Sequence, residues 1–173
     1  LIILSGFFSS SETGMMSLNR YRLKHLQKNK HRGALRAGKL LERPDRLIGL
    51  ILIGNNLVNI LASAIATVIA IRLWGDAGIF IATLVLTLVI LIFAEITPKT
   101  IAALHPEKIA FPASLILWPL LKIMYPLVAM VNWFTNGLLR MLGFDPDKQT
   151  DEHVSSDELR TIVTEAGQLI PAR

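Results

Sequence analysis

Two long stretches without charged side chains constrain this sequence more than any other feature. Residues 77–94 are eighteen residues with no formal charge, and residues 47–71 are twenty-five. A helix needs about 20 mainly apolar residues to cross a hydrocarbon core roughly 30 Å thick. Since 52% of the chain is hydrophobic and its mean hydropathy is +0.49, the sequence predicts an all-α membrane protein.

Three transmembrane helices are predicted, at about residues 1–19, 47–72 and 77–104. Residues 20–46, between the first two, contain ten Lys or Arg residues against two acidic ones. The positive-inside rule places this basic loop in the cytoplasm, where membrane lipid headgroups are an expected partner. Because the loop lies between apolar runs and has few aromatic residues, a nucleic-acid partner is not expected. The sequence thus predicts a multi-pass protein of the cell (plasma) membrane.

The apolar stretch 109–142 carries Pro112, Pro119 and Pro126, one every seven residues. Proline removes a helical N–H and clashes with the preceding turn. We therefore predict broken, partly interfacial juxtamembrane helices here, with a true fourth span as the alternative. The last 29 residues hold seven acidic side chains against three basic ones. They predict that 143–173 begins an acidic, helical, cytosolic linker, after a transmembrane domain of residues 1–142.

One carboxylate, that of Glu95, follows directly after the run 77–94. A carboxylate at membrane depth costs roughly 2.5 to 3.5 kcal/mol, so it is usually turned toward a partner, a cavity or an ion. Pro98 frees a backbone oxygen nearby, and such oxygens with a carboxylate suit a small cation. The alternative is structural: Glu95 pairs with Lys99 at i+4, and Pro98 only bends the helix end.

The first two predicted spans also carry side-chain oxygens. Six polar side chains lie between residues 5 and 13, and Asn55 and Asn59 follow at i and i+4 on one side of a helix. They either bond helices together or line a polar pathway, and three asparagines in five residues favour the pathway. Hydroxyl, amide and carboxylate oxygens favour Mg2+ or Na+ over zinc or copper. The candidate metal ligands are Ser9, Ser11, Asn55, Asn59 and Glu95, with Gly54, Pro98 and Lys99 beside them.

Catalytic signatures are missing from the sequence. It has no cysteine, no HExxH spacing, no phosphate-binding glycine loop and no Ser/His/Asp order. We therefore expect a transporter and not an enzyme. The alternative from another class is a membrane scaffold or sensor, whose polar span residues only mediate helix packing.

Four segments together resemble one family, the CNNM/CorC magnesium transporters, whose membrane part is the DUF21 domain. The segments are FFSSSETGMMSLNRYRL (7–23), LIGNNLVN (52–59), FAEITPKTIA (93–102) and SSDELRTIVTEAGQLIP (155–171). The resemblance implies a homodimer of three-span subunits with a belt of juxtamembrane helices. It also implies export of Mg2+ from the cytosol coupled to Na+ influx. CBS domains that bind ATP are expected in the full-length protein and are not among residues 1–173.

The resemblance also assigns residues to the expected Mg2+ site. The serine of the first span corresponds to Ser9, or to Ser11 in another register. The asparagine of the second span corresponds to Asn59, with Asn55 beside it. The glutamate of the third span corresponds to Glu95, followed by its proline. Mg2+ prefers near-octahedral oxygen coordination at about 2.0 to 2.1 Å, so carbonyls near Phe8 or Gly54 are expected to complete the shell.

Overall fold

The computed structural model describes residues 1–146, and every regular element in that part of the chain is a helix. The all-α class is therefore confirmed. Leu1–Asn132 form one compact unit and the chain from Trp133 onward a second, and each is described by itself. From residue 147 on, the predicted linker 143–173 lies outside the described residues. The elements are α1 (Ile2–Met16), α2 (Arg20–Lys28), α3 (Arg32–Leu41), α4 (Pro44–Trp74), α5 (Ala77–Val89), the π-helix η1 (Ile90–Ile96), α6 (Thr97–Leu104) and α7 (Pro106–Met141).

Three helices of the described part are long and apolar enough to cross a membrane. They are α4 with 31 residues, the continuous helix Ala77–Leu104 with 28, and α7 with 36. The first two cover the ranges predicted at 47–72 and 77–104. Helix α4 begins at Pro44, which needs no N–H partner in a first turn. Gly75, with φ 65°, supplies the turn from α4 to α5, in a conformation that favours glycine.

Helix α1 is shorter than the span predicted over residues 1–19. It has 15 residues, about 22 Å at 1.5 Å per residue, and is not among the three long helices. It stops at Met16 because the chain turns there into α2. The side chain of Asn19 accepts hydrogen bonds from the N–H groups of Tyr21 and Arg22 and so caps the start of α2.

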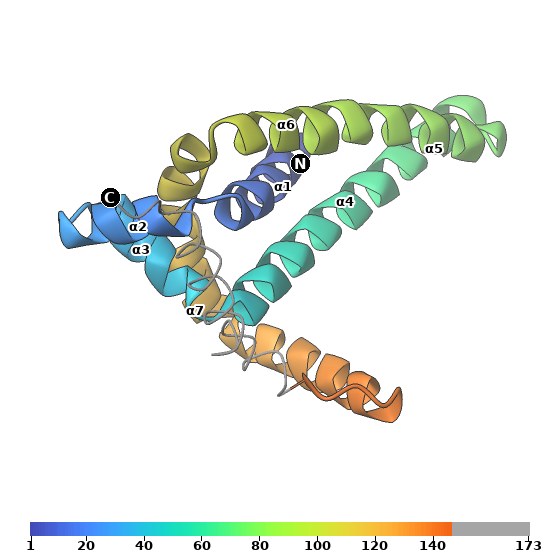
Figure 1. Cartoon of the computed structure of the whole chain (residues 1–173). Helices are drawn as coiled ribbons and strands as arrows, with labels where there is room; N and C mark the ends of the chain where they lie inside the picture. The colour runs from blue at the N-terminus through green and yellow to red at the C-terminus, as the bar shows by residue number, and fades with distance from the viewer. Residues whose placement is uncertain (147–173) are drawn as a thin grey trace, which may run out of the picture. The chain divides into compact units, whose positions relative to one another are not determined.

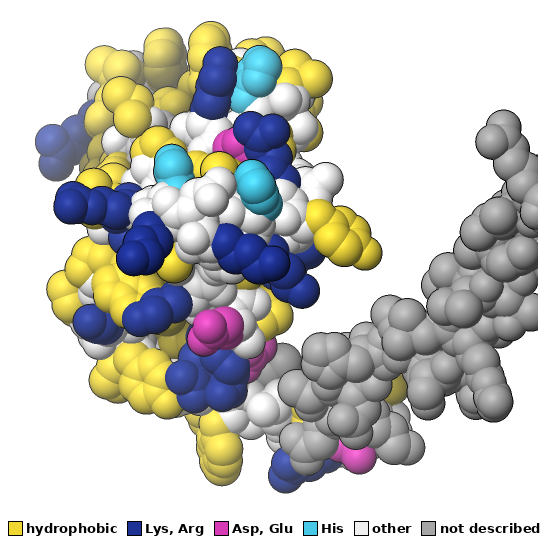
Figure 2. All heavy atoms as spheres, turned by 60° about the vertical axis from the view of Figure 1, so that its left-hand side comes forward, with side chains coloured by type: hydrophobic (Ala, Val, Ile, Leu, Met, Phe, Trp, Pro, Cys, Tyr) yellow, Lys and Arg dark blue, Asp and Glu magenta, His cyan; other side chains and the backbone are white. Residues whose placement is uncertain are grey.

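The basic loop folds into the two short helices α2 and α3. Helix α3 buries Ala34, Ala37, Leu40 and Leu41, whereas its Arg32 and Lys39 are exposed. Figure 2 shows many Lys and Arg side chains, together with His, gathered on one face of the molecule. The sequence clustering of positive charge between residues 20 and 46 is therefore also a clustering in space.

Helix α7 continues through Pro112, Pro119 and Pro126. The structure differs here from the prediction of broken helices over 109–142. Each proline removes a single N–H, and a spacing of seven residues, about two turns, sets all three on one side of the helix. Neighbouring backbone groups in apolar surroundings can adjust around such defects without ending a helix. Whether α7 lies across or along the membrane stays a prediction.

Candidate cation site

Helix α1 packs against both α4 and η1–α6, and two glycines permit the close approach (Figure 1). A Cβ at Gly54 would lie 2.5 Å from the ring of Phe8. A Cβ at Gly6 would lie 3.3 Å from the ring of Pro98 and 3.6 Å from the carbonyl oxygen of Phe93. The first contact is closer than packed carbon atoms allow, so a side chain at Gly54 would push α1 away from α4.

The hydroxyl of Ser5 on α1 lies between two amides of α4. Its Oγ is 3.0 Å from Oδ1 of Asn55 and 2.6 Å from Oδ1 of Asn59. A hydroxyl has one proton to donate, so it satisfies only one of these two amide oxygens at a time. Ser5 is fully buried. Three side-chain oxygens from two helices therefore meet in a place where at least one of them can accept a further positive partner.

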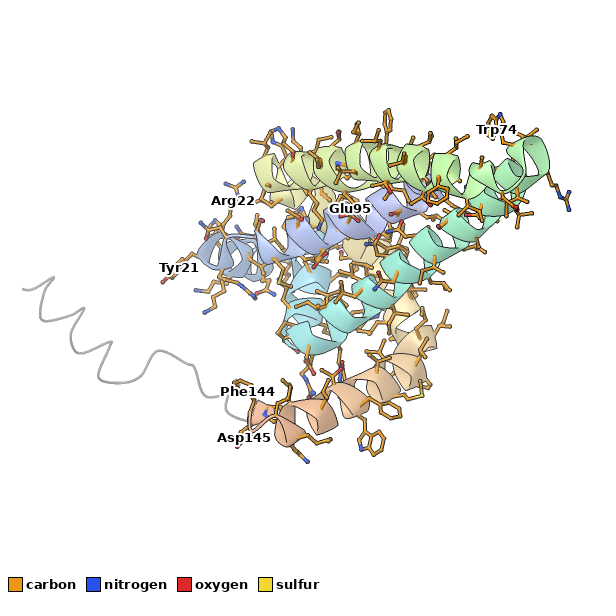
Figure 3. All side chains as sticks on the ribbon, turned by 90° about the vertical axis from the view of Figure 1, so that its right-hand side faces the viewer. Tyr21, Arg22, Trp74, Glu95, Phe144 and Asp145 are labelled. Atoms are coloured by element: carbon orange, nitrogen blue, oxygen red, sulfur yellow. The ribbon has the colours of Figure 1, made fainter. Side chains whose placement is uncertain are left out.

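The carboxylate of Glu95 joins the same cluster from the third helix. Its Oε2 accepts a hydrogen bond from Ser9 Oγ at 3.2 Å, and its Oε1 accepts one from Asn55 Nδ2 at 3.4 Å. Figure 3 shows Glu95 beside α1, where Ser9 contacts it. A continuous chain of contacts thus runs across α4, α1 and η1. We call this set the oxygen cluster: Ser5, Ser9, Asn55, Asn59 and Glu95.

The ion pair predicted as the structural alternative is present as well. Lys99 Nζ lies 3.3 Å from Oε2 of Glu95 and 4.0 Å from Oε2 of Glu12. The side chains of Glu95 and Lys99 are 25% and 43% exposed, so this end of the cluster lies at the surface of the chain. Oε2 of Glu95 therefore contacts both the Ser9 hydroxyl and the Lys99 ammonium group, and Oε1 contacts the amide of Asn55.

The backbone beside Glu95 is irregular in the way that Pro98 suggests. In η1 the helix is π-helical, and the N–H of Thr97 bonds the carbonyl of Ile92, five residues back. Residue 98 has no N–H to offer. The carbonyl of Phe93 therefore lacks its usual helical donor, and this carbonyl faces Gly6 of α1. The freed backbone oxygen that the sequence predicted corresponds to this group.

The structure brings together four of the five predicted ligands and separates Ser11 from them. Ser11 Oγ donates to the carbonyl of Phe7 in its own helix at 2.6 Å, the functionally silent arrangement common for helical hydroxyls. Sequence reasoning did not select Ser5, although it lies four residues before Ser9 and so on the same side of α1. That i, i+4 spacing is the signal that could have identified it.

The chemistry of the oxygen cluster is that of hard, mostly neutral donors. Among the described residues no group of three or more His, Cys, Asp or Glu side chains is placed to hold a metal ion. The cluster therefore differs from zinc or copper sites, which use imidazole and thiolate. One carboxylate with amide and hydroxyl oxygens matches the ligand types of Mg2+ or Na+.

A groove of about 310 Å³ borders Glu95 on the side of α5. Ser63 of α4 and Thr83 and Thr87 of α5 line it, among leucine and isoleucine side chains. Thr83 and Thr87 donate to carbonyls of their own helix, at 2.8 and 2.6 Å. The hydroxyls of Thr83 and Thr87 are thus already satisfied, unlike the oxygens around Ser5.

Comparison with known sequences shows the family of this chain. A family profile described as "Cyclin M transmembrane N-terminal domain" matches residues 1–169. The chain belongs to this family. The resemblance to the CNNM/CorC family is thereby confirmed, and with three long apolar helices among residues 1–146 the chain is a membrane protein.

Several curated proteins are similar over nearly the whole chain. The UPF0053 inner membrane protein YfjD of Escherichia coli K12 is 57% identical over 170 residues, which cover 98% of this chain and 40% of that protein. A UPF0053 protein of Haemophilus influenzae is 56% identical with the same coverage. A chloroplastic DUF21 domain-containing protein of Arabidopsis thaliana is 34% identical over 94% of this chain and 24% of its own length. The chain thus spans about two fifths of its bacterial relatives.

Proposed function

We propose that this chain is the membrane domain of a Mg2+ transporter, and that the oxygen cluster binds the transported ion. The observation that carries the proposal is the convergence of oxygens from α1, α4 and η1 around Glu95. Three of their contacts are oxygen to oxygen, at 3.0, 2.6 and 3.2 Å. Neighbouring oxygens of an octahedral Mg2+ shell are about 2.9 Å apart. The contacts around Ser5 and the contact between Ser9 and Glu95 therefore have nearly the spacing of neighbouring Mg2+ ligands, and Asn55, whose Nδ2 lies 3.4 Å from Glu95 Oε1, joins the two groups.

The charge of the cluster suits transport better than permanent storage of an ion. A single carboxylate binds a divalent cation with modest affinity, and release requires modest affinity. Lys99 lowers it further, because its ammonium group lies 3.3 Å from the same carboxylate. When Mg2+ binds, Lys99 moves off Glu95, and Glu12 is the nearby carboxylate that receives it.

Direction and coupling rest on the family resemblance. We propose export of Mg2+ from the cytosol, coupled to Na+ influx, by a homodimer in the cell membrane. The proposed orientation follows from the positive-inside rule, which places the basic loop in the cytoplasm. The test is Mg2+ flux in proteoliposomes with and without an inward Na+ gradient, with cross-linking to measure the dimer. If Mg2+ flux does not change with the Na+ gradient, the proposed coupling is wrong, but the proposed Mg2+ site is not contradicted.

A scaffold or sensor is the second candidate, and one observation favours it. In the described part of the chain, every buried side-chain nitrogen or oxygen already has a hydrogen-bond partner. The cluster is therefore also an interhelical hydrogen-bond network, which would bond helices together without any ion. A choice between the two functions needs variants that change ion binding and helix assembly differently.

The deciding variants are Glu95→Gln and Asn59→Ala, with Asn56→Ala as the matched control. Asn56 is exposed and makes no side-chain hydrogen bond among the described residues. Transport predicts that Glu95→Gln lowers Mg2+ binding and flux by at least about 100-fold, the effect of removing the only charged ligand, while the dimer persists. A scaffold predicts lost assembly in Asn59→Ala and no saturable Mg2+ binding in the original chain. Equal losses in Asn56→Ala would contradict the assignment of the cluster.

A further inference from the structure

The first two thirds of α7 lie at the end of the bundle that carries the basic loop. Ile109 lies beside Gly14, near the end of α1. Ser114 accepts a hydrogen bond from Arg36 Nε of α3 at 3.4 Å. Val128 lies against Gly49, within six residues of the start of α4. Over about 20 residues α7 thus stays beside α3 and the first turns of α4, and does not follow α4 toward Trp74.

Cations from three helices lie over two aromatic rings on this part of α7. The ring of Trp118 has Lys39 Nζ of α3 at 5.3 Å from its centroid and Lys122 Nζ of α7 at 5.2 Å. The guanidinium of Arg46, on α4, lies 4.9 Å from the ring centroid of Tyr125. All five residues belong to the compact unit Leu1–Asn132. We call this set the aromatic–basic face.

The three cations of this face have no acidic partner among residues 1–146. The ion pairs nearest in the sequence are those of Arg22 with Glu107 and of Arg43 with Asp45, and neither includes Lys39, Arg46 or Lys122. Lys39 and Lys122 also share one ring, so their like charges repel. An anion between them would remove that repulsion and add two charge-assisted contacts.

The opposite side of α7 is apolar and exposed. Ile116 precedes Trp118 by two residues and Ile123 precedes Tyr125 by two, which is about 200° around a helix. Ile116 and Ile123 are 53% and 77% exposed. Trp118, Lys122 and Tyr125 follow at i, i+4 and i+7 and so share one side. A helix with an aromatic and basic side and an exposed apolar side is typical of the surface of a bilayer.

We propose that the aromatic–basic face binds the phosphate of an anionic phospholipid at the cytoplasmic surface. Lys39, Lys122 and Arg46 contact the headgroup, and Trp118 and Tyr125 sit at headgroup depth, where aromatic rings are enriched. Ile116 and Ile123 lie toward the acyl chains. The partner is a lipid and not a soluble anion, because an exposed apolar surface lies on the same short stretch of helix. This site is separate from the oxygen cluster and does not depend on Mg2+ transport.

The test compares two double variants that remove the same charge. Lys39→Gln with Lys122→Gln removes the pair at Trp118, and Lys24→Gln with Lys28→Gln removes two exposed lysines of α2. The chain is placed in nanodiscs of phosphatidylcholine with or without phosphatidylglycerol, and bound phosphatidylglycerol is counted by native mass spectrometry. Thermal unfolding is followed in parallel.

The original chain should retain phosphatidylglycerol in preference to phosphatidylcholine. The Lys39/Lys122 variant should bind it roughly 25-fold more weakly, at about fivefold for each lysine near a membrane surface, and the Lys24/Lys28 variant much less so. Replacement of both lysines by arginine, which keeps the charge and the ring contact, should retain binding.

Three results would overturn the proposal. Equal loss in the two double variants would mean diffuse attraction and no site. Equal stabilisation of the chain by glycerol phosphate in solution would mean a soluble anion and no lipid. A fall in unfolding temperature in the Lys39/Lys122 variant that is the same with and without phosphatidylglycerol would mean that the lysines only hold α3 on α7.

Discussion

Two regions of this molecule hold polar side chains within apolar helices, and they use them differently. Where α1, α4 and η1 meet, Ser5 donates across helices to Asn55 or Asn59, and Ser9 donates to Glu95. In the α4–α5 hairpin, hydroxyls donate to carbonyls four residues back in their own helix. They belong to Thr67, Thr83 and Thr87.

The difference between the two regions arises from packing and not from residue type. Serine and threonine satisfy themselves locally wherever a helix surface offers nothing else. At the oxygen cluster, the bare backbone of Gly54 lets Phe8 and the rest of α1 approach α4, so cross-helix partners come within reach. Whether a polar side chain in a span bonds its own helix or a partner on another helix therefore depends on how closely that other helix approaches.

The largest effect is expected from a variant that keeps α1 away from α4, because the cross-helix contacts of the oxygen cluster would then be lost. In Gly54→Ala the new Cβ would lie 2.5 Å from the Phe8 ring, so we expect a loss of about 1 to 3 kcal/mol of unfolding free energy, as for other overpacked sites. Mg2+ binding should be lost with it. Thermal unfolding in detergent and isothermal titration calorimetry measure the two effects.

Gly49→Ala is the matched control on the same helix. Its Cβ would meet Val128 and Asn132 at 3.4 Å, an ordinary contact distance, so stability should change by less than about 0.5 kcal/mol. If Gly54→Ala unfolds and binds Mg2+ like the original chain, the close approach of Phe8 does not position α1.

The next largest expected effect is on Mg2+ affinity, which should rise when Lys99 is replaced. Lys99→Met removes an ammonium group 3.3 Å from Glu95, so Mg2+ affinity should rise about tenfold, a value already reduced for the 43% exposure of Lys99. Flux at saturating Mg2+ should fall because release slows. Lys99→Arg keeps the charge and should bind Mg2+ as before. Unchanged affinity in Lys99→Met would show that the lysine does not compete with the ion.

A smaller difference in Mg2+ binding is expected between variants of two serines of α1. Ser5→Ala removes the hydroxyl between Asn55 and Asn59 and should weaken Mg2+ binding by about fivefold, near the 1 kcal/mol of one hydrogen bond. Ser11→Ala removes a hydroxyl bonded only to Phe7 of its own helix and should change binding by less than about twofold. Equal effects in the two variants would mean that contact across helices does not distinguish them.

The long helices could be predicted from the sequence because their cause is local. Residues 47–71 and 77–94 carry no charge, and a long apolar run in lipid must be helical. The candidate ligands in α4 and η1 could be selected for the same reason, since polar groups stand out there. The sequence did not predict the continuity of α7. Three prolines at regular spacing suggested breaks, but a helix in apolar surroundings can continue through them.

The choice among the serines of α1 required the structure. Helical spacing places Ser5 and Ser9 on one side of α1, but it does not say which side faces α4. That depends on Gly6 and Gly54, which are more than forty residues apart in the chain and each meet a residue of another helix. The π-helix η1 was not predicted either, because a proline in a helix indicates a backbone irregularity and does not specify a π-helical turn.

The smallest expected effect tests whether the groove beside Glu95 belongs to the ion path. Thr83→Val with Thr87→Val removes two hydroxyls that already donate to their own helix, at 2.8 and 2.6 Å, and valine keeps the shape of threonine. Mg2+ flux in proteoliposomes should change by less than about twofold, since exposed substitutions of this kind usually stay within about 0.5 kcal/mol. A tenfold loss of flux with unchanged Mg2+ affinity would place these hydroxyls on the path. The α4–α5 hairpin would then serve the ion as directly as the meeting point of α1, α4 and η1.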